Sequence, residues 1–84
     1  MKKITVRYFA SIREAIGAGQ EPVQTTATTL GALRDELIAR GGAHATSLAR
    51  GRAVRMALNQ TLSEESAVLV DGAEVAFFPP VTGG

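Results

Sequence analysis

Hydrophobic and polar residues alternate in several short stretches of the chain, and one longer stretch repeats at helical spacing. Residues 3–9 (KITVRYF), 53–58 (AVRMAL) and 74–78 (EVAFF) alternate, which is the pattern of strands with one buried face. In residues 30–38 the leucines and the isoleucine recur at i, i+3, i+7 and i+8, which is the stripe of an amphipathic helix. The pattern therefore predicts three strands and one main helix.

The ends of the main helix carry recognisable signals. Thr29 stands where a hydroxyl caps the first turn, and the pair Gly41-Gly42 stops the helical pattern. Glu36 and Arg40 are four residues apart, so we expect an ion pair along the helix surface.

The shorter elements are predicted from local signals. Ser11 and Glu14 have the spacing of a capping box, which predicts a helix of little more than one turn that ends at Gly17. The β-branched residues of 23–28 (VQTTAT) indicate a second strand. Residues 43–52 (AHATSLARGR) fit either a short helix or a loop.

Two turn signals complete the chain and set the fold class. Asn59-Gln60 leads into a brief strand at 61–62, and Asp71-Gly72 leads into the last strand. The order is strand, short helix, strand, main helix, strand, short strand, strand. This order predicts an α+β fold with a mixed sheet of about five strands and the main helix across one face. We expect residues 1–84 to form a single domain.

Composition narrows the class of function. The 84 residues are 45% hydrophobic and 20% charged with a net charge of +1, which is too balanced for binding driven by nucleic-acid phosphates. Cysteine is absent, so disulfides, thiol nucleophiles and thiolate metal sites are excluded. Neither a secretory leader nor an apolar run of membrane-spanning length is recognisable, and we expect no bound metal and a cytoplasmic location.

The charged residues leave two questions open. Between Glu36 and Glu64 the chain has arginines but no acid, which suggests a surface with two electrostatic sides, although ordinary solvated charge is the favoured interpretation. The last three of these arginines suit an acidic partner, a substrate phosphate or plain solvation: Arg50, Arg52 and Arg55. His44 has no evident acid–base partner in the sequence, and we expect it at the surface.

Residue parity suggests an exposed apolar patch. Val75 and Phe77 share one face of the last strand, so Phe78 points to the other face. Phe9 lies on the outward parity of the first strand, and Leu62 belongs to a segment too short for deep burial. If Phe9, Leu62 and Phe78 converge, they form a contact surface.

The last six residues, 79–84 (PPVTGG), have the properties of an extended tail. Pro79 and Pro80 lack an N–H for sheet pairing and hold the backbone extended. The four residues after Pro80 reach roughly 13 Å at about 3.3 Å each. Gly83 and Gly84 have no Cβ and fit a slot that admits only backbone. The carboxylate of Gly84 is their only reactive group, and chemistry there requires activation, most simply as an acyl phosphate or acyl adenylate.

These segments together resemble a known family. DGAEVAFFPPVTGG resembles the C-terminal signature of the small, sulfur-carrying subunit of molybdopterin synthase, a ubiquitin-like β-grasp protein. RYFASIREAIG is similar to the opening strand and helix of that family, TLGALRDEL to its main helix and ALNQTL to its turn segment. The sequence departs from the family at Gly31, Leu58 and Ala73, which affect helix, core and turn but not the tail.

The resemblance implies a carrier function. An E1-like adenylating enzyme would use ATP to form an acyl adenylate on Gly84, and a sulfur donor protein would convert it to a thiocarboxylate. The sulfur would then pass to cyclic pyranopterin monophosphate in the large synthase subunit, within a heterotetramer of two copies of each subunit. The resemblance implies no catalytic residue and no directly bound cofactor on this chain, since the active-site residues lie on the large subunit.

The same resemblance assigns roles to individual residues. The segment that enters the large subunit would be the tail: Pro80, Val81, Thr82, Gly83 and Gly84. The apolar patch that docks on the partners would consist of Phe9, Leu62 and Phe78.

Other functions remain open from the sequence. Sulfur carriers for thiamine or cysteine synthesis also end in Gly-Gly, and a ubiquitin-like modifier shares the activation step but forms an isopeptide bond. A simple binding module would keep its function without the two glycines.

Overall fold

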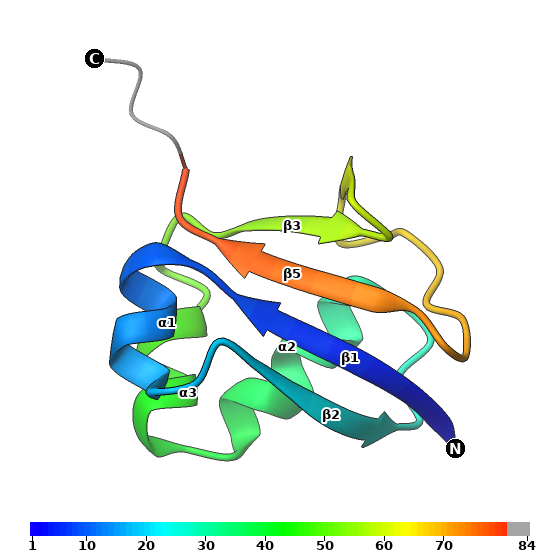
Figure 1. Cartoon of the computed structure of the whole chain (residues 1–84), viewed down its shortest axis with the longest axis horizontal. Coiled ribbons are helices and arrows are strands. Elements are labelled where there is room, and N and C mark those ends of the chain that lie inside the picture. The colour runs from blue at the N-terminus through cyan, green and yellow to red at the C-terminus, as the bar shows by residue number, and fades with distance from the viewer. Residues whose placement is uncertain (81–84) are drawn as a thin grey trace.

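The computed structural model describes residues 1–80, which form one sheet with helices packed against it (Figure 1). The strands are β1 (Lys2–Tyr8), β2 (Gln20–Thr25), β3 (Arg55–Leu58), β4 (Thr61–Ser63) and β5 (Glu74–Phe78). The helices are α1 (Ala10–Ile16), α2 (Leu30–Ala39) and α3 (Gly42–Leu48). None of the described helices is long and apolar enough to cross a bilayer.

The sheet is mixed, with the strand order β2-β1-β5-β3-β4. The central pair β1 and β5 is parallel, and the other three pairs are antiparallel. The first and last strands of the chain thus lie side by side in the middle of the sheet (Figure 1). This arrangement confirms the predicted α+β class and the mixed five-stranded sheet.

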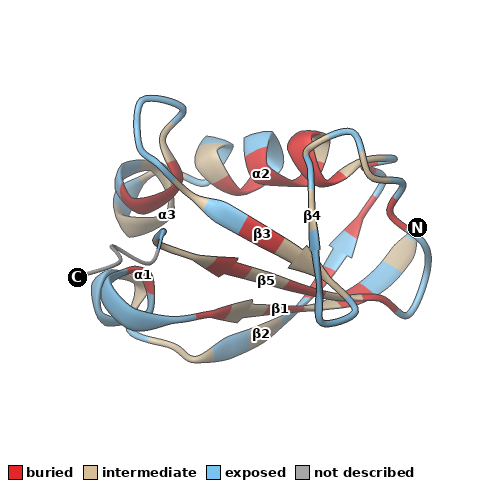
Figure 2. Cartoon of the chain, turned by 90° about the horizontal axis from the view of Figure 1, so that it is seen from above, coloured by how far each residue is buried: buried red, intermediate tan, exposed pale blue. Residues whose placement is uncertain are grey.

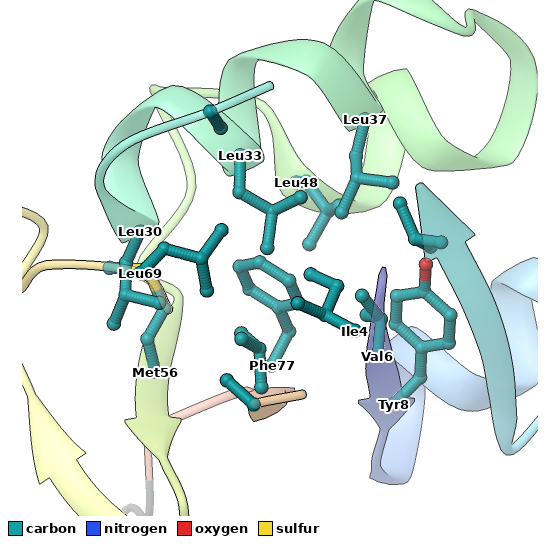
Figure 3. Packing of buried hydrophobic residues seen from close by; sticks show 14 of the residues in the cluster. Ile4, Val6, Tyr8, Leu30, Leu33, Leu37, Leu48, Met56, Leu69 and Phe77 are labelled. Atoms are coloured by element: carbon teal, nitrogen blue, oxygen red, sulfur yellow. The ribbon is translucent and has the colours of Figure 1, made fainter. Parts of the chain in front are cut away.

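Helices α2 and α3 cover one face of the sheet, as Figure 2 shows. The leucine stripe of α2 meets the buried side chains of the central strands, and Leu33 and Phe77 are both fully buried (Figure 3). Burial of one such side chain stabilises the fold by about 1.5–3 kcal/mol. Every second residue of β1 and β5 is buried in this core, so the residues between them face away from the helices.

The start of α1 differs from the predicted capping box. The helix begins at Ala10, Phe9 occupies the N-cap position, and no side chain caps the first turn. The reason is the sheet: the Phe9 N–H donates to the carbonyl of Phe77 at 3.2 Å, so the chain turns immediately after this contact. Ser11 therefore lies inside the helix, whereas Gly17 ends it in the left-handed conformation, as predicted.

The predicted cap of α2 is confirmed, but the predicted ion pair on its surface is wrong. The hydroxyl of Thr29 accepts the N–H of Ala32 at 3.2 Å. Arg40 turns away from Glu36 and donates to Glu21 on β2 at 2.6 Å. Both ends of the expected pair thus bind the neighbouring strand, since Glu36 accepts the hydroxyl of a β2 threonine.

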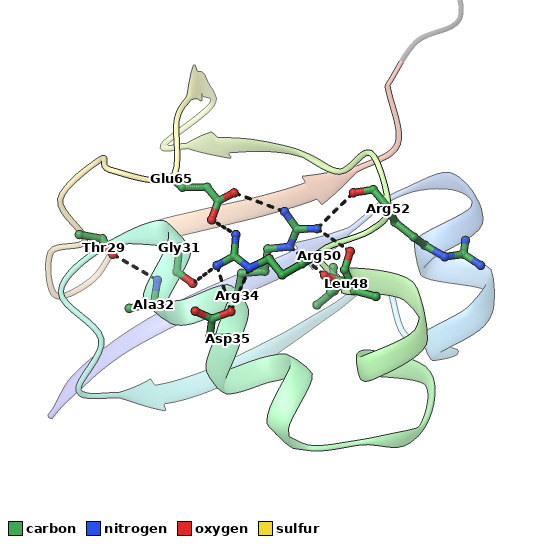
Figure 4. Close-up of polar contacts among 10 residues, drawn as sticks. Thr29, Gly31, Ala32, Arg34, Asp35, Leu48, Arg50, Arg52 and Glu65 are labelled. Carbon is green, nitrogen blue, oxygen red and sulfur yellow. Dashed lines mark hydrogen bonds and ion pairs between the residues drawn. The ribbon is translucent and has the colours of Figure 1, made fainter.

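Residues 43–52 contain most of helix α3 and the loop that follows it, and a buried arginine holds both. Arg34 of α2 is only 4% exposed. Its Nε donates to the carbonyl of Leu48 at 2.8 Å, and its Nη2 donates to the carbonyls of Ala49 at 2.8 Å and Arg52 at 3.3 Å (Figure 4). A short helix without a side-chain cap at its start is therefore fixed at its end by a charged donor from α2.

Arg50 is not simply solvated, the interpretation favoured from the sequence, because it pairs with acids of its own chain. Arg50 donates to Asp35 at 3.0 Å and to Glu65, so it joins α2 to the segment after β4 (Figure 4). Arg52 and Arg55 are exposed. Because acids from elsewhere in the chain surround Arg50, the arginines after residue 36 do not make one uniformly basic side.

Candidate functional site

The face of the sheet opposite α2 and α3 carries a row of side chains from four neighbouring strands. Strand register places Arg7 beside Ala76, Ala76 beside Ala57, and Ala57 beside Leu62. Side chains that are directly opposite in register point to the same face. The small alanines at the centre of this row leave the surface low between two larger side chains.

A second row lies nearer the end of β5 and carries the aromatic residues. Phe78 pairs in register with Arg55 of β3, and Phe9 follows β1 on the other side of β5. Phe9 is 38% exposed, and Phe78 is partly buried. The two phenylalanines therefore border the low alanine surface at the point where the chain leaves the sheet.

Most of these residues line an open groove of about 660 Å³. Its apolar lining comes from Phe9, Ala10, Ala57, Ala76, Phe78, Pro79 and Pro80. Its polar lining comes from Arg7, Gln60 and Glu74. An apolar hollow with a few polar groups is the usual form of a surface that receives a ligand or another protein.

The structure brings two of the three predicted patch residues together and leaves the third apart. Phe9 and Phe78 line the groove, as parity suggested. Leu62 lies on the same face and is 61% exposed, but it lines an adjacent hollow with Arg55. Leu62 therefore lies on the same face, next to the groove residue Ala57, but does not itself line the groove.

The base of the predicted tail forms one wall of this groove. Pro79 is partly buried and Pro80 is exposed, and both line the hollow. The remaining tail residues, Val81, Thr82, Gly83 and Gly84, lie outside the described residues. The groove therefore lies at the point from which the predicted carrier segment continues.

Asn59 fixes the edge of the site. Asn59 and Gln60 both have positive φ, 50° and 69°, which a tight hairpin between β3 and β4 requires. The Asn59 side-chain oxygen accepts the backbone N–H of Glu74 at 2.9 Å, and the backbone N–H of Asn59 donates to the Glu74 carbonyl at 2.8 Å. The predicted turn thus also ties the hairpin to the first residue of β5.

Arg7 and Glu74 are functional candidates that the sequence analysis did not select. The Arg7 guanidinium carbon lies 5.1 Å from the centre of the Phe9 ring, and an Nη lies 3.8 Å from a carboxylate oxygen of Glu74. Parity is the signal that could have revealed them, because Arg7 and Phe9 occupy alternate positions on one side of the first strand.

His44 has an acidic partner, contrary to the prediction, and lies on the helix side of the sheet. Its Nε2 is 2.9 Å from a carboxylate oxygen of Glu21, which also accepts the hydroxyl of Tyr8 at 2.7 Å. Burial alone would raise the pKa of Glu21, but hydrogen bonds from Arg40, His44 and Tyr8 outweigh it and lower that pKa to about 2. Burial and the bond to Glu21 raise the pKa of Tyr8, so the phenol stays a donor. The cluster joins α3 to β2 and does not line the groove.

Glu21 should make stability sensitive to acid. Its pKa in the fold, about 2, lies below the ordinary value of 4.5. The stabilisation is therefore complete above about pH 4.5 and is lost as the pH falls toward 2. We expect a loss on the order of 2 kcal/mol, reduced by partial exposure of the carboxylate. Urea unfolding between pH 2 and 7 measures it. Glu21→Gln should be less stable at pH 7 and should show a flatter acid dependence, and an equally steep fall in this variant would contradict the assignment.

The described residues offer no cluster of three or more His, Asp or Glu side chains suited to a metal ion. What the described part of the chain does offer is an apolar groove with one cation, Arg7, in its lining, next to the base of the predicted tail. This arrangement suits docking and presentation of the tail to another protein.

The fold and this face define a ubiquitin-like β-grasp protein. The crystal structure of SAMP1 from Haloferax volcanii has the same fold, with a TM-score of 0.77 and 24% identity over 98% of this chain and 99% of its own. The sequence model of the ThiS family matches residues 6–84. The chain therefore belongs to the ThiS family.

Two further relatives carry more specific names. The molybdopterin synthase sulfur carrier subunit of Escherichia coli (strain K12) is 43% identical over 81 residues, which are 96% of this chain and 99% of the relative. A protein–protein complex of subunits 1 and 2 of the molybdopterin-converting factor from Helicobacter pylori 26695 contains a chain with a TM-score of 0.64 and 26% identity. The match covers 98% of this chain and 99% of that one.

Proposed function

We propose that this chain is a sulfur carrier in molybdopterin synthesis. The observation that carries the proposal is the apolar groove between Phe9 and Phe78, with Pro79 and Pro80 in its wall. A carrier needs a docking surface fixed relative to the segment that it presents, and this groove adjoins the base of residues 79–84. Family membership and the name of the Escherichia coli relative support the same function.

The reactive group in this proposal is the carboxylate of Gly84. A partner adenylating enzyme joins it to AMP with release of pyrophosphate from ATP. A sulfide equivalent from a sulfur donor protein then displaces AMP and leaves a thiocarboxylate. ATP binds to the partner enzyme, and the groove on this chain supplies the docking surface. The setting we propose is the cytoplasm.

The sulfur acceptor in this proposal is cyclic pyranopterin monophosphate, bound by a large synthase subunit. The solved Helicobacter pylori complex of subunits 1 and 2 supports a partner of this kind. We propose that the outer face of the sheet docks on that subunit, with two copies of each chain in the assembly. Residues 80–84 enter its active site, where the thiocarboxylate sulfur is transferred to the pterin and water cleaves the acyl–sulfur bond, which regenerates the carboxylate.

Intact-mass spectrometry tests this function. Incubation with the cognate adenylating enzyme, ATP and a sulfur donor should increase the mass by the difference between one sulfur and one oxygen atom. Addition of the large subunit and cyclic pyranopterin monophosphate should reverse this gain and yield molybdopterin. No gain with ATP would contradict the proposal. Isopeptide adducts on lysines would identify a modifier, and sulfur passed only to a thiamine or cysteine precursor would identify another pathway.

A further inference from the structure

Arg7 is the one positively charged side chain that lines the groove among the described residues. It stands at the end of the row that continues through Ala76, Ala57 and Leu62. A cation at this position is unexpected in a surface built mainly of alanine, phenylalanine and proline. Its position and hydrogen bonding therefore indicate which partner the groove accepts.

The fold holds the Arg7 guanidinium in place but does not satisfy it. The Phe9 ring lies 5.1 Å from the guanidinium carbon, and Glu74 is 3.8 Å from Nη1, which is at the long limit for an ion pair. The Nε of Arg7 is buried and has no hydrogen-bond partner among the described residues. The Arg7 side chain as a whole is 39% exposed, so other N–H groups still reach water.

Docking of a partner would remove that water. A guanidinium has five N–H donors in a fixed planar arrangement, and Glu74 is placed to accept from only one side. If the covering surface were apolar, the remaining donors would be buried without acceptors, which strongly disfavours binding. The groove thus selects against partners that lack an acceptor at this point.

The charges of this face favour a carboxylate as that acceptor. Exposed Arg55 of β3 pairs in register with Phe78 of β5 and adds a second positive charge at the border of the groove. Exposed Lys3 lies on the same face of β1 but outside the groove, and it does not contribute to the charge of the docking surface. Glu74 is the only acid that lines the groove among the described residues. The surface is therefore net positive and complements an acidic one.

We infer that Arg7 determines partner specificity by pairing with a carboxylate on the docking surface of the large synthase subunit. This inference rests on the proposed function. Arg7 is here a binding residue and takes no part in the chemistry at Gly84. A carboxylate can accept two parallel hydrogen bonds from the guanidinium, which fixes the orientation of the docked partner as well as its charge.

Binding of the cognate large subunit to three variants tests the inference. Arg7→Met keeps the apolar stem and removes the charge, and Arg7→Lys keeps the charge but lacks the fork of donors. Lys3→Met removes one charge from the same face of the same strand, four residues away, or roughly 13 Å. That distance exceeds the screening length of about 8 Å at physiological salt. Calorimetric titration at two salt concentrations then measures affinity and its salt dependence.

We expect Arg7→Met to weaken binding roughly thirtyfold or more and to flatten the salt dependence. Arg7→Lys should be intermediate, and Lys3→Met should bind like the unsubstituted chain. Equal affinity for Arg7→Met and the unsubstituted chain would overturn the inference, as would a loss shared equally with Lys3→Met. A weaker complex with unchanged salt dependence would also overturn it, because packing and not charge would then be responsible.

Phe78→Asp separates this inference from the proposed function. It places a charge in the apolar lining of the groove and should abolish detectable docking while the fold is kept, since Phe78 lies outside the core cluster. If Phe78→Asp fails to bind and Arg7→Met binds normally, the groove is the docking surface and only the role of Arg7 is wrong. If the unsubstituted chain does not bind the large subunit, or Phe78→Asp binds as well as it does, the proposed function itself fails.

Discussion

Deletion of Gly84, or addition of one glycine after it, is expected to reduce sulfur transfer more than about a hundredfold and to leave the fold unchanged. Both variants still end in glycine, so the reacting group keeps its chemical nature and only its distance from the docking groove changes. One residue moves that group by about 3.3 Å, whereas misplacement by roughly 1 Å can already cost a hundredfold in rate. The core lies within residues 4–77 and is not touched by either change.

The matched control is Thr82→Ser, which alters a tail side chain but keeps the length. Molybdopterin formation per sulfurated chain, with the cognate large subunit, measures the effect, and thermal unfolding checks the fold. Normal transfer by the shortened or lengthened chain would show that the position of the terminal carbonyl is not set by tail length. Equal losses in all three variants would show that tail composition, and not length, governs transfer.

Strand parity and helix spacing predicted the features of the fold that depend on local pattern. The alternation in residues 3–9 and 74–78 correctly separated core positions from outward ones, which is why Phe9 and Phe78 were predicted on the outward face, where the groove lies. Thr29 was correctly predicted as the cap of α2. These signals depend only on residues close together in the sequence, so they can be interpreted without knowledge of tertiary contacts.

Interactions between distant segments were predicted poorly. Glu36 and Arg40 have ideal spacing for a helix pair, yet each hydrogen-bonds to a residue of β2 instead. His44 and Glu21 are 23 positions apart in the chain, and only the packing of α3 brings them within 2.9 Å. The charge pattern along the sequence does not reveal which charged residues from distant segments come into contact in the fold.

Gly31 shows how a departure from local rules can have a tertiary cause. A glycine in the first turn of α2 costs up to about 1 kcal/mol in helix propensity. A Cβ at this position would lie 2.9 Å from the Glu65 carboxylate and 3.3 Å from the Glu65 carbonyl oxygen. The Gly31 N–H also donates to that carbonyl at 2.9 Å. The glycine therefore permits the segment after β4 to pack against the start of α2.

Helix α3 could not be distinguished from a loop in the sequence because contacts with other parts of the fold supply most of its stability. It has seven residues, among them glycine, threonine and serine, and an isolated helix of this length and composition does not form in water. Its last carbonyls depend on Arg34, which belongs to a different helix and looks in the sequence like an ordinary charged residue on α2. The sequence pattern could not predict that this arginine is buried.

Arg34→Met is accordingly expected to destabilise the protein by roughly 3 kcal/mol. Burial and the charge of Arg50 lower the pKa of Arg34, and Glu65 and Asp35 oppose this, so the guanidinium remains charged in the fold. Methionine fills the space of the stem but leaves the carbonyls of Leu48 and Ala49 without their donor. A domain of 84 residues is usually stable by roughly 4–13 kcal/mol, so this loss is a large fraction.

Thermal unfolding should show the loss as a fall in Tm of roughly 12–24 °C. Arg50→Met is the matched control: it makes the same exchange in the same network, but Arg50 is 44% exposed and bonds mainly to exposed carboxylates, so the cost should be about 1 kcal/mol or less. Equal costs for the two variants would mean that burial does not set the importance of Arg34. Hydrogen exchange adds a second criterion: because Arg34 binds the end of α3, protection in Gly42–Leu48 should fall before protection in β1 and β5.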